Sequence, residues 1–303
     1  MRDHISVCIC TYHRNAMLAK LLRHLAFQET RGLLTFSVVV VDNDSSAPAR
    51  ADVDRIRLET GLEITYEVEP IRTIPAARNH ALQLIKGNFI GIIDDDEFPP
   101  PNWLITLYDA VRTFDVDGAL GPVYPFFEER PPDWLVKGGI YEWPRLRTGT
   151  LLHWQQTRTS NVLIKRDVID RHGIRFDESF KTGGSDKAFF KQAIDLGFRF
   201  VAAEEAPVYE VFPPERWTKR YFIRRALVNG YNARKYLAKE GNGRKSSIAF
   251  LRSAIVLPVF ILGSPICALV GSQVLVKWME GGFYHLSMLA AFLGIELRKK
   301  RGF

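Results

Sequence analysis

The chain has 303 residues, 47% of them hydrophobic, which is enough to bury an α/β core of about 200–250 residues together with a smaller appendage. Its net charge is +7, but residues 212–303 hold 16 Lys and Arg against 4 Asp and Glu, so the rest of the chain is mildly acidic. This distribution argues against nucleic acid as a partner, and three scattered cysteines exclude a disulfide framework. The first apolar run is too short for a signal peptide, so we expect the main domain to be cytosolic.

Predicted strands and helices alternate along the first third of the chain. Short apolar runs rich in β-branched residues predict strands at residues 5–10, 36–41, 64–69 and 89–93. Amphipathic patterns between them predict helices at residues 16–27, 49–59 and 75–85, and a further helix begins near Trp103. This alternation predicts an α/β fold: a Rossmann-like, mostly parallel sheet with helices on both faces, whose ligands bind beyond the carboxyl ends of the strands.

An acidic cluster follows the last of these strands. The apolar run 89–93 leads directly into Asp94, Asp95, Asp96 and Glu97, and three prolines then break the backbone. Like charges this close repel one another, so a divalent cation is the simplest reason to gather them at the end of a buried strand. Mg²⁺ and Mn²⁺ prefer such oxygen ligands, together with substrate phosphates. The alternative is an acidic cap for the helix near Trp103, for which one Asp would suffice.

Polar side chains also follow the other predicted strands. They are Thr11, Tyr12 and Arg14 after the first, Asp42 and Asn43 after the second, and Arg78 near the start of the next helix. Asp42 could instead be an ordinary turn residue, and Arg78 an exposed helix residue. The sequence contains no GxGxxG or Walker A motif, which argues against a dinucleotide site or a P-loop.

Taken in order, these motifs resemble a known family. CTYHR, VVVVDNDSS, PAARNHAL and IIDDDE are similar to the nucleotide-sugar-binding half of a family 2 glycosyltransferase with the GT-A fold. GPVYP, RTSNVLIKR and GGSDKAFFKQA further along resemble bacterial exopolysaccharide glycosyltransferases of the succinoglycan type. The resemblance covers about residues 4–235, and its specificity lies in the ordered set of motifs.

The resemblance implies roles for individual residues. Asp94 and Asp96 would form the DxD pair, with Asp96 holding Mg²⁺ or Mn²⁺, and Arg78 would contact the pyrophosphate. Uridine would be bound by Thr11, Tyr12 and Asp42. The full set that we expect to bind the UDP-sugar is Thr11, Tyr12, Arg14, Asp42, Asn43, Arg78, Asp94 and Asp95.

An inverting transfer also needs a base for the acceptor hydroxyl. Asp186 follows two glycines and Ser185 and opens a predicted amphipathic helix, where it could alternatively act as an N-terminal cap. The family's usual pair of acids lies at this point, so the resemblance makes Asp186 the base, although Ser185 replaces the first acid. A second departure is Tyr209, where many relatives carry a His, so the cation would depend on Asp96, phosphate oxygens and water.

The C-terminal region predicts membrane association. Residues 253–276 contain no charge, a stretch long enough to span a bilayer, and a second apolar run covers residues 283–295. Pro258 and Pro265 interrupt the first run, so a re-entrant or interfacial helix pair, or a hairpin packed on the protein, are alternatives. Basic residues at 219–245 and 298–301 flank the region, which favours the cytoplasmic face of a bacterial inner membrane and contact with anionic lipids.

We therefore expect a GT-A catalytic domain at residues 1–215, with halves 1–125 and 126–215, a basic amphipathic helix at 216–245 and a membrane-associated helical hairpin at 246–303. The expected activity is transfer of a sugar from a UDP-sugar to a polyprenyl-diphosphate-linked saccharide. One alternative is a polyprenyl-phosphate sugar synthase, whose lipid phosphate acceptor needs no base. Another is a membrane-anchored nucleotide-sugar-binding protein without turnover.

Overall fold

The computed structural model describes residues 2–141, 144–180, 183–239 and 241–297. By packing, the chain forms two compact units: Met1–Phe126 with Trp143–Val211, and Phe127–Glu142 with Phe212–Phe303. The second unit is therefore assembled from two separate stretches of sequence. The division predicted at residues 125, 215 and 245 stays a prediction, and the basic run 298–301 lies outside the described residues.

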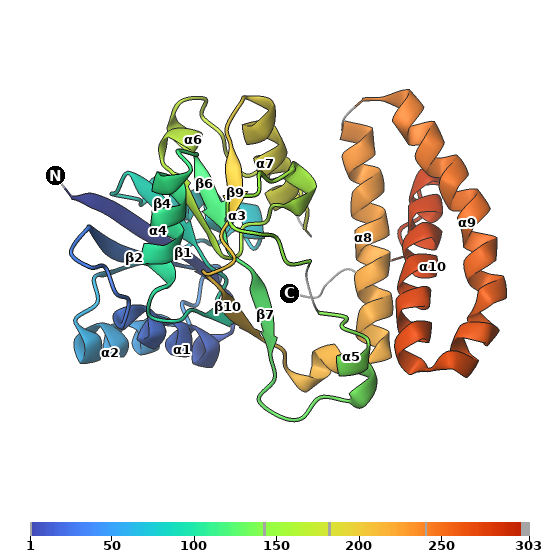
Figure 1. Cartoon of the computed structure of the whole chain (residues 1–303), viewed down its shortest axis with the longest axis horizontal. Helices are drawn as coiled ribbons and strands as arrows, with labels where there is room; N and C mark the ends of the chain where they lie inside the picture. The colour runs from blue at the N-terminus through green and yellow to red at the C-terminus, as the bar shows by residue number, and fades with distance from the viewer. Residues whose placement is uncertain (1, 142–143, 181–182, 240, 298–303) are drawn as a thin grey trace. The chain divides into compact units, whose positions relative to one another are not determined.

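The first unit is built on a seven-stranded sheet of order β3-β2-β1-β4-β8-β6-β9 (Figure 1). β8 is antiparallel to both of its neighbours, and all other pairs are parallel. The carboxyl ends of the parallel strands thus share one edge with the start of β8. The strands are β1 (Asp3–Thr11), β2 (Leu34–Asp42), β3 (Ile64–Val68), β4 (Phe89–Ile92), β6 (Gly118–Leu120), β8 (Val162–Lys165) and β9 (Phe200–Ala202).

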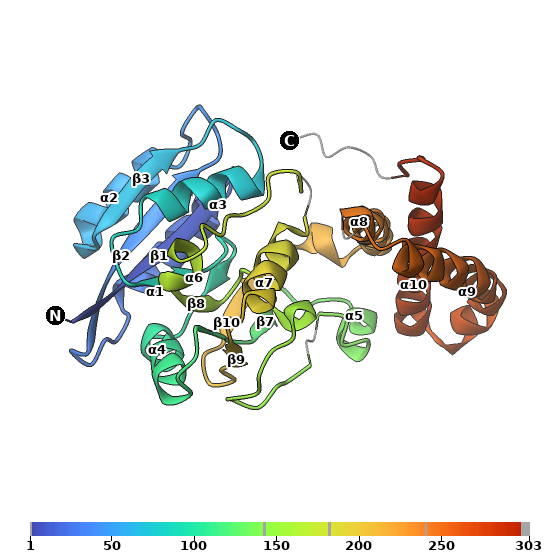
Figure 2. The same ribbon diagram turned by 90° about the horizontal axis from the view of Figure 1, so that it is seen from above.

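Helices cover both faces of this sheet, which confirms the predicted α/β fold. One face carries α1 (Asn15–Ala26), α2 (Arg50–Thr60) and α4 (Trp103–Thr113). The other carries α3 (Ile74–Gln83), α6 (Asp167–Asp170) and α7 (Ser185–Asp195). In Figure 2, α3 runs along β1 and β2. Every strand and helix predicted for residues 5–93 is present, within two residues of its expected bounds.

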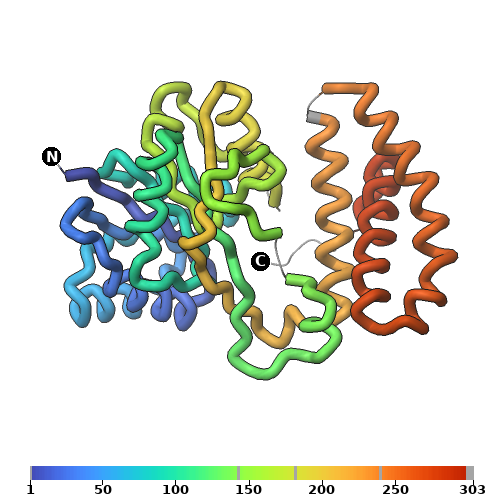
Figure 3. The backbone as a smooth tube through the Cα atoms, in the orientation of Figure 1, coloured from blue at the N-terminus to red at the C-terminus, as the bar shows by residue number. Residues whose placement is uncertain are grey.

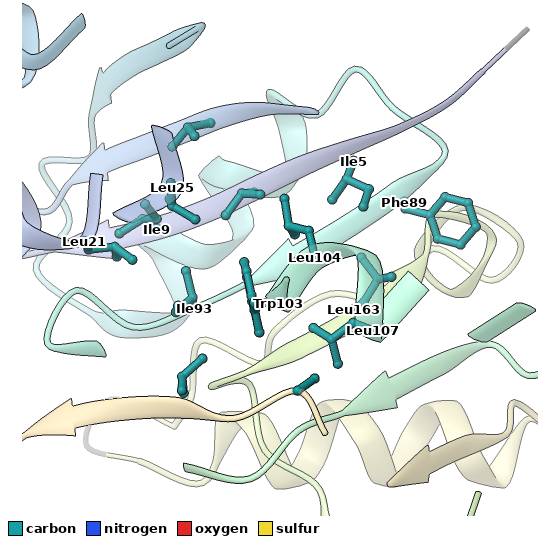
Figure 4. Packing of buried hydrophobic residues seen from close by; sticks show 14 of the residues in the cluster. Ile5, Ile9, Leu21, Leu25, Phe89, Ile93, Trp103, Leu104, Leu107 and Leu163 are labelled. Carbon is teal, nitrogen blue, oxygen red and sulfur yellow. The ribbon is translucent and has the colours of Figure 1, made fainter. Parts of the chain in front are cut away.

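Side-chain periodicity explains these two layers. Leucines at positions 18, 21, 22 and 25 form one fully buried stripe on α1, the spacing of a helix face. They pack with Ile5, Val7 and Ile9, which alternate along β1 and so share one face of the sheet. Cys8 points to the opposite face and joins the cluster below α3. Figure 4 shows Ile5 and Ile9 in the same core as Trp103 of α4.

A small second sheet determines which side chains face the functional edge. Its order is β5 (Glu97–Phe98), β10 (Val208–Val211) and β7 (Val123–Phe126). Tyr209 is opposite Phe98 and stacks on its ring at 5.5 Å, whereas Glu210 is opposite Glu97. Because neighbouring residues of a strand point to opposite faces, Glu210 lies with the acids and Tyr209 does not. The ring of Tyr209 is thus turned away from the acidic edge.

Asn161 connects several segments behind this edge. Its backbone has φ 51°, a left-handed conformation that Asn tolerates better than most residues. Its side-chain amide donates to the carbonyls of Pro122 and Ala206 at 2.7 and 2.8 Å, and its Oδ1 accepts from Trp103 Nε1 at 2.7 Å. All three hydrogen bonds are long-range, so one side chain joins the loop before β8 to α4 and to the ends of two further segments.

Replacing Asn161 by alanine is expected to lower the free energy of unfolding by roughly 3 kcal/mol, because the buried Trp103 Nε1–H and Ala206 carbonyl lose their partner and the left-handed backbone loses a tolerant residue. Urea unfolding followed by circular dichroism measures this change. The exposed Asn102 at the start of α4 provides the control, since Asn102→Ala should change stability by less than 1 kcal/mol. Equal stability of the two variants would contradict the prediction.

The second unit is mainly helical. It contains α5 (Asp133–Lys137), the short helix Pro214–Trp217, α8 (Lys219–Lys239), α9 (Gly243–Val270) and α10 (Ser272–Phe292). The last three helices follow one another as the final part of the tube in Figure 3. Buried aromatic and aliphatic side chains hold the unit together, and they include Leu135, Tyr141, Phe212, Trp217, Phe222 and Val276.

The apolar tail folds differently from the simplest expectation. The uncharged run 253–276 does not form one helix: the chain turns at Gly271, whose φ of 149° suits glycine, and continues into α10. Pro258 and Pro265 instead lie inside α9, and the predicted gap before residue 283 lies inside α10. α9 and α10 pack together as a hairpin, in which Trp278 Nε1 donates to the carbonyl of Phe260 at 2.6 Å.

Among the described residues, α9 is the helix that is long and apolar enough to cross a membrane. It has 28 residues and a mean hydropathy of 2.3 over its most apolar window, of which only 11% is buried. Exposed aliphatic side chains such as Ile255, Leu262 and Leu269 cover its surface. α10 lies against α8, where Glu280 pairs with Arg225 at 2.7 Å.

Candidate active site

The acids after β4 are held in a network of charged hydrogen bonds. Arg14, in the loop after β1, reaches Asp95 Oδ1 at 2.7 Å and Asp96 Oδ2 at 2.9 Å through the same nitrogen. Thr11, the last residue of β1, donates to Asp95 Oδ2 at 2.8 Å. These contacts arise because β1 and β4 are parallel neighbours, so both strands end at the same edge. Four predicted site residues, Thr11, Arg14, Asp95 and Asp96, are thereby brought together.

Arg78 reaches the same cluster from the opposite direction. Thr73 caps the start of α3 by accepting a hydrogen bond from Ala76, and Pro75 occupies its first turn. This start places Arg78 one turn into the helix, where its guanidinium lies 3.3 Å from Asp94. The Asp94 side chain remains 43% exposed, so one carboxylate of the cluster is open to a ligand.

The residues after β2 are tied to their surroundings. Asp42 is fully buried, and its Oδ2 accepts from the Tyr66 hydroxyl at 2.6 Å and from the Ala49 amide at 3.1 Å. Asn43 donates to two carbonyls that follow β3, at 2.9 and 2.7 Å, and so fixes that loop. Both side chains therefore stabilise the edge itself.

Two groups after β1 and β2, a carboxylate oxygen of Asp42 and the ring of Tyr12, are candidates to contact a ligand. The other carboxylate oxygen of Asp42, Oδ1, is enclosed but has no hydrogen-bond partner within the part of the chain that the structure describes. Tyr12, half-buried, meets the His13 ring edge-on at 4.3 Å between centroids, with the Arg72 guanidinium 5.9 Å from its own ring. Hydrogen bonds from Ser46 lower the pKa of Asp44 to about 2 and keep it charged beside His13.

The charge balance at the edge is negative. Burial, followed by the negative charge of Asp96, raises the pKa of Asp95 to about 6, although Arg14 opposes this shift. Burial together with Asp94 and Glu210 raises the pKa of Glu97 well above its usual range. Burial is the first cause of both shifts, and the neighbouring acids add to it.

This arrangement fits a divalent cation. The donors are carboxylate oxygens, which Mg²⁺ and Mn²⁺ prefer, and the side chain of Asp94 is 43% exposed beside them. Asp96 is the side chain that would hold the ion. No group of three His, Cys, Asp or Glu side chains is arranged to hold a metal by itself among the described residues, so the remaining ligands would come from substrate and water.

Asp186 lies at the start of α7, on the face of the sheet that α3 and α6 also cover. The helix begins at Ser185 after Gly184, which has φ 93° and supplies no side-chain cap. Asp186 is the second residue of the helix and is half-buried, and its carboxylate has no hydrogen bond or ion pair with any residue in the described ranges. A carboxylate in the first turn of a helix is favoured by the helix dipole.

Two charged residues of this edge were missed from the sequence. Glu210 joins the acids through its pairing with Glu97, and Arg158 is a mostly buried guanidinium that donates to the Gly121 carbonyl at 2.6 Å. Burial lowers the pKa of Arg158, and nearby acids oppose the shift: these are Glu97, Glu210 and Asp94. The alternation of Val208 to Val211 could have indicated Glu210, but Arg158 lies in a loop without any periodic pattern.

Cavities formed by the described residues of the first unit include two near its sheet. One, of about 190 Å³, opens beside Arg158 and the ends of β6 and β9. The other is a shallow depression of about 490 Å³ at the start of β4, lined by basic side chains that include Lys86, Arg112 and Lys165. The pocket beside Arg158 lies at the carboxyl ends of β6 and β9, the edge of the sheet that also carries the acids, whereas the larger depression lies at the opposite end of β4.

Comparisons with known proteins agree with this architecture. Two solved structures that share the fold are mannosyltransferase PcManGT from Pyrobaculum calidifontis, in complex with GDP-Man and Mn²⁺, and S. aureus TarS 1–349 in complex with UDP-GlcNAc. PcManGT has a TM-score of 0.61 and 18% identity, covering 97% of this chain and 88% of that one. For TarS the TM-score is 0.54 and the identity 15%, covering 98% and 93%. These likenesses confirm a GT-A-like α/β fold.

Sequence comparison gives the family. The model for "Glycosyl transferase family 2" matches residues 6–173. Succinoglycan biosynthesis protein ExoM from Rhizobium meliloti (strain 1021) is 32% identical over 251 residues, which cover 80% of this chain and 78% of that protein. This chain is thus a transferase related to proteins of exopolysaccharide biosynthesis, and it belongs to glycosyl transferase family 2.

Proposed function

We propose that the protein transfers a sugar from a UDP-sugar to a lipid-linked saccharide, with inversion at the sugar, during bacterial polysaccharide assembly. The observation that carries this proposal is the meeting of Asp94–Asp96 with Arg14 and Arg78 at the carboxyl edge of the sheet. Acids that attract a cation, beside guanidinium groups that bind phosphate, suit a nucleoside diphosphate leaving group.

The base and ribose would lie over the ends of β1 and β2. Tyr12 offers a half-exposed ring, and Asp42 Oδ1 is an acceptor without a partner in the described chain, which suits the N3–H of uracil. Since that oxygen is enclosed, the contact requires a local rearrangement. Asn43 supports the site through the loop that it fixes. The UDP-GlcNAc complex of TarS favours UDP, and the GDP-Man complex of PcManGT makes GDP the alternative to test.

The diphosphate would lie between Arg78 and Arg14. When bound on Asp96, Mg²⁺ or Mn²⁺ would supply positive charge for the leaving diphosphate. Arg78 offers a second positive group, and its bond to Asp94 holds it at the mouth of the cluster. Arg14 contacts both Asp95 and Asp96, and its positive charge opposes the rise in the pKa of Asp95 that burial causes. Each of these residues thus lowers the cost of charge that develops on the phosphate.

Asp186 is proposed as the base that takes the proton of the acceptor hydroxyl. Its carboxylate carries no other contact in the described chain and opens α7 close to the half of the edge formed by β8, β6 and β9. An available base favours a hydroxyl acceptor over a lipid phosphate, which would already be ionised and need no base. This argues for a saccharide acceptor rather than for synthesis of a polyprenyl-phosphate sugar.

The acceptor is proposed to be a polyprenyl-diphosphate-linked saccharide at the cytoplasmic face of the inner membrane. α9 presents exposed aliphatic side chains, and the helix before it carries basic residues that attract anionic lipids. ExoM, by its name, belongs to succinoglycan biosynthesis, which is the assembly of a polysaccharide.

The experiment that tests the proposal is a panel of UDP- and GDP-sugars supplied with a bacterial membrane lipid extract and Mn²⁺. We expect one UDP-sugar to label a lipid fraction in which mild acid releases the labelled saccharide. Labelled lipid monophosphate sugar as the product would favour the synthase instead. Binding of UDP-sugars without any transfer to the extract would favour a protein that only binds nucleotide-sugar.

A further prediction concerns attachment to the membrane. The protein is expected to sediment with membranes and to stay there in about 1 M NaCl, because insertion of apolar surface resists salt whereas attraction between charges does not. Deletion from Ser246 onward removes α9 and α10 and should release a protein that still binds UDP. Immunoblots of salt-washed membranes measure this, and complete extraction by salt would show that no insertion occurs.

A further inference from the structure

The strand order divides the functional edge of the sheet into two halves, one on each side of β4. β4, which delivers the acids, lies between β1 and β8 (Figure 1). The residues proposed to bind nucleotide follow β1 and β2, on one side of β4. The pocket of about 190 Å³ lies on the other side, at the ends of β6 and β9. A nucleotide and a second ligand could therefore occupy the edge together, with the acids between them.

We propose that this pocket binds one pyranose ring of the saccharide acceptor. The inference rests on the proposed function, and it goes further by assigning the acceptor a place and a set of side chains. The volume suits a single sugar ring rather than a nucleotide. The ring is that of the sugar that receives the transferred residue.

The lining has the mixed chemistry that a sugar needs. Apolar side chains that include Leu120, Leu146 and Leu152 can pack against the C–H faces of the ring. Tyr124, Gln155 and Glu204 offer hydroxyl, amide and carboxylate groups for its hydroxyls. A pocket with apolar walls and a few converging polar groups is the usual form of a small-molecule site.

The pocket is joined to the proposed base. The ammonium of Lys187, the residue after Asp186, donates to the main-chain carbonyl of Gln155 at 2.7 Å and to that of Thr157. These bonds attach the wall of the pocket to the first turn of α7. We therefore place the reacting hydroxyl of the ring on the side of the pocket that these bonds join to α7.

The pocket is joined to the acids as well. Arg158 and Gly121 both line it, and the guanidinium of Arg158 donates to the Gly121 carbonyl at 2.6 Å. The same guanidinium lies within the electrostatic field of Glu97 and Asp94. The pocket thus stands between the proposed base and the place of the leaving group, as an acceptor in an inverting transfer must.

Gln155→Ala is the most informative variant. The side-chain amide of Gln155 makes no hydrogen bond with the described residues, and its main-chain carbonyl, which holds Lys187, is kept in the variant. Gln156 is unsuitable, because its Oε1 accepts from the amide of His153 and supports the short helix Trp154–Gln156. Gln192→Ala, on the exposed side of α7, is the matched control.

The first measurement is direct binding without turnover. The full-length protein with UDP and Mn²⁺ is titrated with the methyl glycosides of glucose, galactose, N-acetylglucosamine and glucuronic acid, and saturation-transfer NMR detects the bound ring. We expect at least one glycoside to bind saturably to the parent and to Gln192→Ala, and roughly three- to tenfold more weakly to Gln155→Ala, as loss of one hydrogen bond implies. Binding of none, or equal binding to both variants, would overturn the proposal.

The second measurement separates acceptor from donor. In the transfer assay, Gln155→Ala should raise the KM for the lipid acceptor roughly three- to tenfold and leave the KM for the donor and the affinity for UDP unchanged. A raised donor KM with an unchanged acceptor KM would assign the ring to the donor and refute the inference. Glycoside binding without any transfer would refute the proposed function and keep the pocket, whereas transfer with an unchanged acceptor KM would refute the pocket and keep the function.

Discussion

Replacing Asp96 by alanine is expected to abolish Mn²⁺-dependent binding of UDP and to remove turnover, while the protein stays folded. Asp96 is the buried acid proposed to hold the cation, and loss of the positive charge that offsets the leaving diphosphate costs several kcal/mol in the transition state. Folding should survive, because Arg14 keeps its bond to Asp95 at 2.7 Å when Asp96 is truncated. Calorimetry of UDP binding with and without Mn²⁺ measures the effect.

Asp109→Ala is the matched control for this variant. Asp109 lies on α4 outside the cluster, is partly exposed, and contacts Arg31 at 3.4 Å, so its loss removes an acid without touching the site. The control should bind UDP and Mn²⁺ as the parent does. Equal Mn²⁺-UDP affinity in Asp96→Ala and in the parent would show that Asp96 does not hold the ion.

Replacing Asp186 by asparagine should reduce turnover by roughly 10²–10⁴-fold, the usual contribution of a general base. Asparagine keeps the shape of the side chain, and α7 begins without a side-chain cap, so stability should change by less than about 1 kcal/mol. The affinity for UDP should also stay the same, because the residues proposed for the nucleotide belong to other elements. Single-turnover transfer to the lipid acceptor, with parallel thermal unfolding, measures both effects.

Asp195→Asn provides the comparison at the other end of the same helix. Asp195 is exposed and pairs with Lys191 within α7, so this substitution also removes one acid from the helix but none from the edge. It should leave transfer unchanged. If Asp186→Asn transfers sugar at the parent rate, Asp186 is a helix-terminal acid only, and another residue must take the proton.

Most of the first unit could be predicted from the sequence, because its elements have strong local patterns. The leucine stripe of α1 and the valines of β2 each determine one element by themselves. The rule that ligands bind beyond the carboxyl ends of parallel strands predicted one functional edge, and in the structure Thr11 and Asp95 meet at this edge through a hydrogen bond of 2.8 Å.

The parts that could not be predicted depend on long-range pairing. β5 has two residues, too few for any periodicity, and Glu210 joins Glu97 through a pairing between distant parts of the chain. The turn at Gly271 was missed for a related reason: the prolines at 258 and 265 are tolerated within α9, and the break comes where glycine adopts φ 149°. In both cases the local structure depends on contacts between residues far apart in the sequence, which a local pattern does not reveal.

The discontinuous second unit has a consequence for synthesis of the protein and for engineering it. During translation, Trp134, Leu135 and Tyr141 leave the ribosome well before Phe222 and Val276, the residues that cover them in the finished unit. These apolar side chains stay exposed to solvent until the last helices have been synthesised. We therefore expect chaperones to bind this segment during translation. A fragment restricted to the first unit therefore needs two changes: an end after Val211 and a short linker in place of residues 127–142. Truncation after Val211 alone would leave residues 127–142 uncovered, whereas deletion from Ser246 onward keeps Phe222 against Trp134.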